Sequence, residues 1–275
     1  SLYLEALEHI AKTYASFRES GMALYTVAQS LTQIDQPYQQ PRQTGIGNER
    51  IKADNPKAKK MLEEIIAAFP KSEAAYQAEI LLSQIQEHFL SLQNEQIVLP
   101  NQPSLALLRF KNVPVVHCKI VALSMNEWME KMEYNHTSSL SYASKNAIQT
   151  WSIELPRTED FLQHTTEIAL KPLPMGNYVI LLSEDEAFSD KENLVFAYMQ
   201  VSNIAFVSAN YSDVTNLNMQ RNASDWHLMN RTTGEPLENA KVKTWQRNYD
   251  YTTRKESWKN GKIYTSNKDG LIAFG

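Results

Sequence analysis

The chain has 275 residues, of which 43% are hydrophobic and 21% are charged, which is ordinary for a globular protein of two or three domains. Its formal net charge is −4 and it has no long run of Lys and Arg. We therefore expect no nucleic-acid partner, because such binding needs a basic face. No apolar run approaches the roughly 20 residues that cross a bilayer, so no transmembrane segment is expected in this sequence.

The single cysteine, Cys118, excludes an internal disulfide framework. Sparing use of cysteine fits the cytosol, and it also fits a bacterial envelope protein that avoids this residue. The first residues follow a helical pattern without a basic segment ahead of an apolar one, so no signal peptide is visible.

Residues 1–90 carry apolar side chains at spacings of three and four, which predicts a helical domain with four helices. The first apolar face comprises Leu4, Leu7, Ile10, Ala11, Tyr14 and Phe17. The second comprises Ala23, Leu24, Val27, Ala28, Leu31 and Ile34. Residues 36–50 interrupt the pattern with two Pro and two Gly, which indicates a loop.

The third and fourth helices have distinct start signals. Asn55 suits the N-cap of the third helix and Pro56 its first position, and Pro70 ends it. Ser72 suits the N-cap of the fourth helix. The apolar face of the fourth helix is expected to comprise Ala75, Tyr76, Leu81, Leu82, Ile85 and Phe89.

Ala58, Leu62, Ile65 and Pro70 fall where a tetratricopeptide repeat has a small residue, two core apolar residues and a turn proline. The helices therefore resemble a pair of tetratricopeptide-like hairpins. A plain helical bundle is the alternative, and in either arrangement the apolar faces form a core.

Near residue 90 the apolar period changes from 3.6 to 2, which indicates β-strands. Seven strands are expected, at residues 88–92, 104–110, 115–123, 148–155, 164–170, 177–183 and 194–201. They predict an antiparallel β-sandwich of the immunoglobulin or fibronectin type over residues 91–202. Residues 124–147 do not fit the pattern and are expected to insert a short helix and a polar loop.

Residues 203–275 are expected to contain about five more strands, in a second and incomplete β-sandwich. The turn-rich residues 232–236 precede alternating residues, so we expect a hairpin with a positive φ at Gly234. The pair Asp269-Gly270 predicts a second hairpin turn. A sandwich without its last strands exposes a sheet edge, so we expect this sequence to be the front part of a longer polypeptide.

Four motifs in the β-rich part resemble the alpha-2-macroglobulin family, specifically its bacterial branch. LKPLPMGNYVILLS at 170–183 resembles the strand that closes one macroglobulin-type sandwich, and VSNIAFVSA at 201–209 resembles the start of the next. NRTTGEPLENAKVKTW at 230–245 is similar to a recurrent hairpin of these sandwiches. TSNKDGLIAF at 265–274 is similar to the strand that returns beside that hairpin.

The resemblance implies a multidomain chain of tetratricopeptide-like helical hairpins followed by two macroglobulin-type β-sandwiches, the last incomplete. It implies a non-catalytic part of a protease inhibitor with a defence or colonisation role. In such a trap a protease cuts a bait segment and is enclosed as the sandwiches collapse. It further implies a bacterial envelope location, periplasmic or as a membrane-anchored lipoprotein. The target protease would be bound through the rest of the chain, and the helices would have an envelope protein partner.

Reactive members of that family carry an internal thioester in a Cys-x-Glu-Gln motif. Cys118 is followed by Lys119, Ile120 and Val121, so it cannot form this thioester. It alternates with Val116 and Ile120 and is expected to be a core residue.

No catalytic, cofactor-binding or metal-binding residue is predicted, and no cofactor is expected. The histidines lack the spacing of metal ligands and are expected at the surface or its boundary: His9, His88, His117, His136, His164 and His227. The acidic residues 184–186 lack the pattern of an EF-hand loop and are expected to form a solvated loop.

The tryptophans leave open an alternative function, an extracytoplasmic binding or adhesion module that recognises a glycan or a protein. Trp151 and Trp245 are expected in the core, whereas Trp258, in the polar sequence ESWKNG, is expected to be exposed. A hydrolase is disfavoured, because the sequence offers no nucleophile motif with an accompanying base and oxyanion donors.

Overall fold

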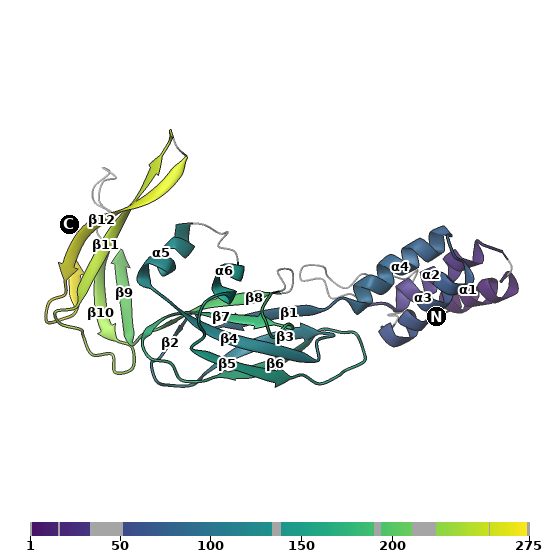
Figure 1. Cartoon of the computed structure of the whole chain (residues 1–275), viewed down its shortest axis with the longest axis horizontal. Helices are drawn as coiled ribbons and strands as arrows, with labels where there is room; N and C mark the ends of the chain where they lie inside the picture. Colours follow the sequence, from purple (N-terminus) through teal and green to yellow (C-terminus); the bar gives the residue numbers. More distant parts are fainter. Residues whose placement is uncertain are drawn as a thin grey trace.

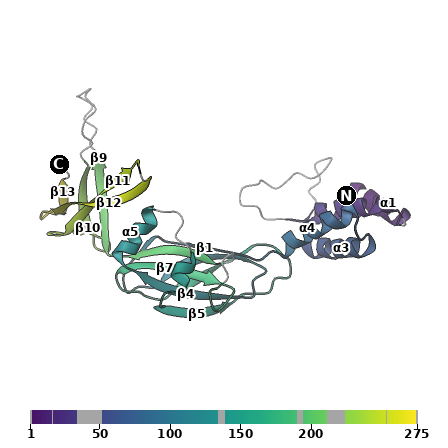
Figure 2. The same ribbon diagram turned by 45° about the horizontal axis from the view of Figure 1, so that its top comes forward.

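The computed structural model describes residues 2–15, 17–33, 52–133, 139–189, 194–210, 224–252 and 254–273. The described chain is elongated, with four helices at one end, eight strands in the middle and five strands at the other end (Figure 1). Figure 2 shows the same three parts from a second direction. The fold is therefore β-rich, with several sheets and accessory helices, and its division into domains at residues 90 and 202 stays a prediction.

The helices are α1 (Leu2–Thr13), α2 (Ser20–Leu31), α3 (Asn55–Ala68) and α4 (Glu73–Gln86). α1 packs against α2, α2 also packs against α3 and α4, and α3 packs against α4. Their facing apolar side chains form a buried cluster around Val27, Leu62 and Ile65. The loop expected at 36–50 lies outside the described residues.

The start of α3 differs from the sequence prediction. Its N-cap is Asp54, whose carboxylate accepts a hydrogen bond from the Lys57 N–H at 3.0 Å. Asn55, predicted as the cap, is the first helical residue, and its side-chain amide instead bonds the backbone of Gln33. Ser72 caps α4 as expected, accepting a hydrogen bond from a backbone N–H of the first turn at 3.0 Å.

Part of the apolar face predicted for the helices is exposed. Ile10, Tyr14 and Phe17 are 46%, 53% and 59% exposed. The prediction is wrong here because α1 ends at Thr13, before the two aromatic residues, and because α1 packs mainly against one neighbour. Tyr76 is exposed as well, since α4 turns a different stripe inward, formed by Ala74, Ala75, Ala78, Leu81 and Ile85.

The middle part is a β-sandwich, and its strands are β1 (Phe89–Asn94), β2 (Ile97–Val98), β3 (Ser104–Lys111), β4 (Val115–Leu123), β5 (Gln149–Glu154), β6 (His164–Leu170), β7 (Gly176–Ser183) and β8 (Val195–Val201). One sheet has the order β1-β3-β6 and the other β2-β8-β7-β4-β5. All seven strands expected from the sequence are present, and Phe89 belongs to β1 rather than to the fourth helix. The additional strand, β2, has two residues and pairs in parallel with β8, so the sandwich is not purely antiparallel.

The core of the sandwich lies between its two sheets. Val116, Cys118 and Ile120 of β4 point into it together, as the alternation predicts, and the half-buried Trp151 packs against it. Cys118 is 1% exposed, and burial raises the pKa of its thiol to about 12. This side chain therefore acts as a small apolar residue rather than a nucleophile.

Two short helices, α5 (Met125–Glu133) and α6 (Ser139–Ala143), cover the outer face of the five-stranded sheet, where the sequence predicts one helix and a loop within residues 124–147. Trp128 and Tyr142 pack there against Val179 and Leu181 of β7. β7 is consequently buried on both faces, which explains its unbroken apolar sequence.

The first turn of α5 is held by a capping box. The Ser124 hydroxyl accepts a hydrogen bond from the Glu127 N–H, and the Glu127 carboxylate accepts one from the Ser124 N–H at 2.8 Å. The Lys145 ammonium donates to the same carboxylate. The hydrogen bonds from Lys145 and Ser124 lower the pKa of Glu127 to about 2.

The last part contains β9 (Ile204–Asn210), β10 (Ser224–Asn230), β11 (Lys241–Asp250), β12 (Lys255–Thr265) and β13 (Leu271–Ala273), matching the five strands expected. β13, β10 and β9 form one sheet in that order, and β11 pairs with β12 in a separate ribbon. Leu228 and Ile272 are the buried apolar residues of this sheet.

The turn predicted at residues 232–236 forms a short hairpin, whereas β12 and β13, on either side of the Asp269-Gly270 turn, do not pair with each other. Residues 230–235 make a tight turn with φ 74° at Gly234, as expected, and then Met229 bridges Pro236. The chain next enters β11 in the ribbon, since β9 pairs along one edge of β10, and β13 followed by residues 235–237 occupies the other edge. The turn at Asp269-Gly270 likewise links β12 to β13 across the sheets.

Candidate functional site

The histidines do not converge in the described structure. The Nδ1 atom of His88 lies 2.7 Å from the Glu184 carboxylate, and the Nε2 atom of His164 lies 3.0 Å from the Asp160 carboxylate. Across the described ranges, no three His, Cys, Asp or Glu side chains are grouped as a metal site requires. His136 lies outside the described residues.

The acidic residues 184–186 shape a turn. The Asp185 carboxylate accepts hydrogen bonds from the N–H groups of Ala187 and Ser189 at 3.0 and 2.9 Å. Its oxygens are thus engaged by the backbone of its own loop, which agrees with the loop expected there.

Two tryptophans, Trp245 and Trp258, lie in the ribbon of β11 and β12. Trp245 is half-buried outside the buried clusters, with the Lys243 ammonium 4.9 Å from its ring centre. Trp258 is half-buried rather than exposed, because its neighbours Ser257 and Lys259 take the outward positions of β12. Its indole N–H is shielded from solvent and has no hydrogen-bond partner among the described residues.

Side chains of several segments do meet where the helices join the sandwich. α4 ends without a capping bond of its own at Glu87. Lys111, at the end of β3, donates from Nζ to the carbonyl of Gln84 at 2.8 Å. Asn112 donates from Nδ2 to the carbonyls of Ile85 and Glu87 at 2.9 and 3.0 Å. The β3–β4 turn therefore caps α4, and the Lys111 charge complements the negative end of the helix.

A second contact comes from the loop between β5 and β6. Phe161 packs against the buried cluster of the helices, although it is 106 residues away from Asn55 in sequence. The Nδ2 atom of Asn55 donates to the Phe161 carbonyl at 3.3 Å. Asn55 is 2% exposed, so its amide must find partners inside the protein. This need explains why Asn55 occupies the first turn of α3 rather than its cap.

Between these contacts lies a cavity of about 490 Å³, which we call the joint cavity. Its walls come from residues 86–88, 110–114 and 156–161, which are the α4–β1 connection, the β3–β4 turn and the β5–β6 loop. Phe110 and Val113 are buried and form part of its apolar wall. Arg157 and Glu159 are exposed at its rim. In the described part of the chain, neither has a hydrogen bond or an ion pair.

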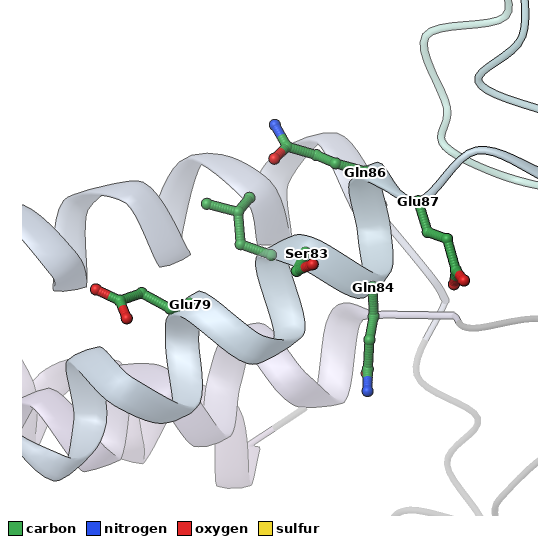
Figure 3. A pocket seen from close by; sticks show the side chains of 6 residues that line it. Glu79, Ser83, Gln84, Gln86 and Glu87 are labelled. Atoms are coloured by element: carbon green, nitrogen blue, oxygen red, sulfur yellow. The ribbon is translucent and has the colours of Figure 1, made fainter. Parts of the chain in front are cut away.

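A second hollow, of about 510 Å³, runs along the C-terminal half of α4. The side chains that line it point in different directions (Figure 3). It holds the carboxylates of Glu79 and Glu87 and no cationic side chain among its lining residues. Side chains that point away from one another cannot contact one ligand together, so the joint cavity is the stronger candidate for a binding site.

Sequence reasoning missed the joint because each of its residues is ordinary in its own neighbourhood. The sequence around Lys111 and Asn112 indicates only a polar turn, and Phe161 is one apolar residue in a loop. The signal that could have drawn attention to α4 is the lack of Gly or Asn after its last turn, which leaves its carbonyls without a local cap.

No protein-family profile matches the sequence, and no curated protein matches it. Among solved structures, the native form of E. coli alpha-2-macroglobulin is similar at 12% identity and a TM-score of 0.34, over 68% of this chain and 11% of that chain. Red sea bream transglutaminase is similar at 10% identity and a TM-score of 0.27, over 74% of this chain and 29% of that one. A CARDB domain from Pyrococcus furiosus is similar at 13% identity and a TM-score of 0.25, over 42% of this chain and 88% of that domain. At such TM-scores, none of these likenesses assigns the chain to a family.

Proposed function

We propose that this chain is a non-catalytic framework segment of an alpha-2-macroglobulin-like protease trap. The order of the four motifs between residues 170 and 274 motivates the family. The observation that carries the framework role is the joint, where side chains of the sandwich cap α4 and Phe161 packs against the helical cluster. A trap that works by moving its domains needs segments that move as units, and such bonded joints favour that behaviour.

The connection between β8 and β9 supports the same role. Ser202 and Asn203 are the two residues between these strands. The Ser202 N–H donates to the Val98 carbonyl at 2.9 Å, and the Asn203 carbonyl accepts from the Arg231 N–H at 2.7 Å. This short linker is thus bonded to the sandwich before it and to the sheet after it, which restricts relative motion of the two parts.

The remaining parts of the proposal follow from the resemblance. The protein acts in the bacterial envelope, the target protease is held by other parts of the full-length chain, and the segment performs no catalysis. The helical end binds an envelope protein, and the exposed side chains of Ile10, Tyr14 and Phe17 are its contact surface. The described chain has no helix that is both long and apolar enough to span a bilayer.

The test compares two substrates of one protease in the presence of the full-length protein. A trap blocks cleavage of a large protein substrate and leaves cleavage of a small chromogenic peptide nearly unchanged, because the enclosed protease keeps its active site. The 275-residue chain alone should block neither. Equal loss of both activities would indicate an active-site inhibitor, and hydrolysis of peptides by the chain alone would contradict the framework role.

A further inference from the structure

The joint cavity has the size and the walls of a ligand site. Its volume of about 490 Å³ lies within the range of roughly 300–1,000 Å³ that is usual for such sites. Phe110 and Val113 are 3% and 2% exposed overall, and Pro114 and Pro156 line the cavity beside them. Prolines and buried side chains have little conformational freedom to lose when a ligand binds, so this apolar wall is already ordered.

The backbone around the cavity is held in a costly conformation. Asn112, Glu159 and Phe161 have φ values of 57°, 53° and 56°, in the left-handed region that non-glycine residues rarely adopt. All three residues line the cavity. Such conformations persist only where the surroundings enforce them, and they cluster at ligand sites. Glu159 and Phe161 lie in the β5–β6 loop, which closes one side of the cavity, and Asn112 lies in the β3–β4 turn.

The charges at the rim point to the ligand class. The Nδ1 atom of His88 is engaged by Glu184 at 2.7 Å, so this side chain already has its partner. Arg157 and Glu159 are a cation and an anion, and in the described part of the chain neither is paired, with the other or with a third residue. A guanidinium recognises a carboxylate and a carboxylate recognises an ammonium. The rim therefore complements a neutral ligand that carries both charges.

We propose that the joint cavity binds a short zwitterionic ligand with an apolar side chain, either a free amino acid or a short peptide. Arg157 holds the ligand carboxylate, Glu159 holds its ammonium, and the apolar side chain lies against Phe110 and Val113. This proposal does not rest on the protease-trap function. Because the cavity is walled by both the helical part and the sandwich, a ligand bound there also strengthens the joint.

The test uses the dipeptide leucyl-phenylalanine as the probe and titration calorimetry of the chain at pH 7. Capping the amine by acetylation, or the carboxylate as an amide, should each weaken binding by up to about fivefold, the upper end of the range for solvent-exposed ion pairs. Arg157→Gln should weaken binding of the free dipeptide as much as the amide cap does, and it should leave the affinity for the amide-capped dipeptide unchanged. Glu159→Gln should weaken binding of the free dipeptide as much as acetylation does, and it should leave the affinity for the acetylated dipeptide unchanged. Free phenylalanine, as a separate arm, distinguishes an amino acid from a peptide as the preferred occupant.

Arg231→Gln is the matched control, because Arg231 is an exposed arginine in the last part of the chain, outside the cavity lining. It should leave all affinities unchanged. Thr158→Trp supplies a second test by filling the rim, and it should abolish binding while the thermal transition of the protein is retained. The proposal is overturned if no probe saturates at millimolar concentration. It is equally overturned if the capped and free dipeptides bind alike, or if Arg157→Gln and Arg231→Gln have the same effect.

Discussion

Replacing Asn112 should uncouple the helices from the sandwich. Its side chain makes two hydrogen bonds to the last carbonyls of α4, at 2.9 and 3.0 Å, and its φ of 57° is left-handed. Each bond contributes about 0.5–1.5 kcal/mol to stability, and a left-handed alanine costs about 1–2 kcal/mol. Asn112→Ala should therefore cost about 2–5 kcal/mol, and Asn112→Gly, which keeps the backbone relaxed, about 1–3 kcal/mol.

Asn101 provides the control for the energetic cost of the left-handed backbone. It also has a φ of 57°, and its side chain makes no hydrogen bond in the described structure. Asn101→Ala should cost about 1–2 kcal/mol and Asn101→Gly almost nothing. The difference between the alanine variants at positions 112 and 101 therefore measures the two bonds across the joint.

The assay follows urea unfolding with two signals that separate the parts of the chain. All five tryptophans lie beyond residue 124, so fluorescence reports the β-rich part, whereas circular dichroism at 222 nm reports mainly the helices. In Asn112→Ala the helical signal should be lost at lower urea than the fluorescence signal. Equal midpoint shifts in Asn112→Ala and Asn101→Ala would refute the reasoning, because the bonds to α4 would then contribute nothing.

Three further predictions concern other parts of the fold. Gly270→Ala should destabilise the fold by about 3 kcal/mol or more in thermal unfolding, because φ is 72° and the added Cβ would lie 2.2 Å from a β10 carbonyl. Gly234→Ala, with φ 74° and open space around it, should cost only about 1 kcal/mol. Similar costs for the two variants would contradict the packing at Gly270. The pKa of Glu127 falls from 4.5 to about 2 on folding, so its stabilisation of α5 is complete above pH 4.5 and is lost as the pH falls toward 2. In a variant that keeps Trp128 as its single tryptophan, the fluorescence should change over that pH range. The change should disappear when Glu127→Gln is added. Cys118 should react slowly with a thiol reagent in the native protein and quickly in denaturant, and rapid native labelling would show that it is not buried.

The elements that sequence reasoning located correctly are those whose signal is local. Alternation in β4 identified the inward face of Val116, Cys118 and Ile120, and the side-chain hydroxyl of Ser72 marked the start of α4. The capping box of Ser124 and Glu127 carries an equally local signal, a serine followed three residues later by a glutamate, although the sequence prediction placed only a short helix within residues 124–147. Periodicity and caps are written within a few residues, so one sequence is enough to read them.

The parts that could not be predicted depend on which elements become neighbours. A turn such as the one at Gly234 has the same sequence signature whether the next strand pairs with the previous one or crosses to another sheet. β9 pairs along one edge of β10, and β13 followed by residues 235–237 occupies the other edge, so β11 lies in a separate ribbon. The exposure of Tyr14 and Phe17 is non-local in the same way, because the length of α1 and the helices around it determine which side chains are covered.

The joint also changes what a domain boundary near residue 90 means. The sequence places the change from helical to strand period at that position, but α4 has no cap of its own and takes its capping donors from Lys111 and Asn112 of the sandwich. Lys111 is 8% exposed, and its ammonium donates in turn to the Gln84 carbonyl at 2.8 Å. Each part thus supplies polar groups that the other needs. Cutting the chain at residue 88 should therefore fray the last turn of α4, even though the cut falls between elements rather than within one.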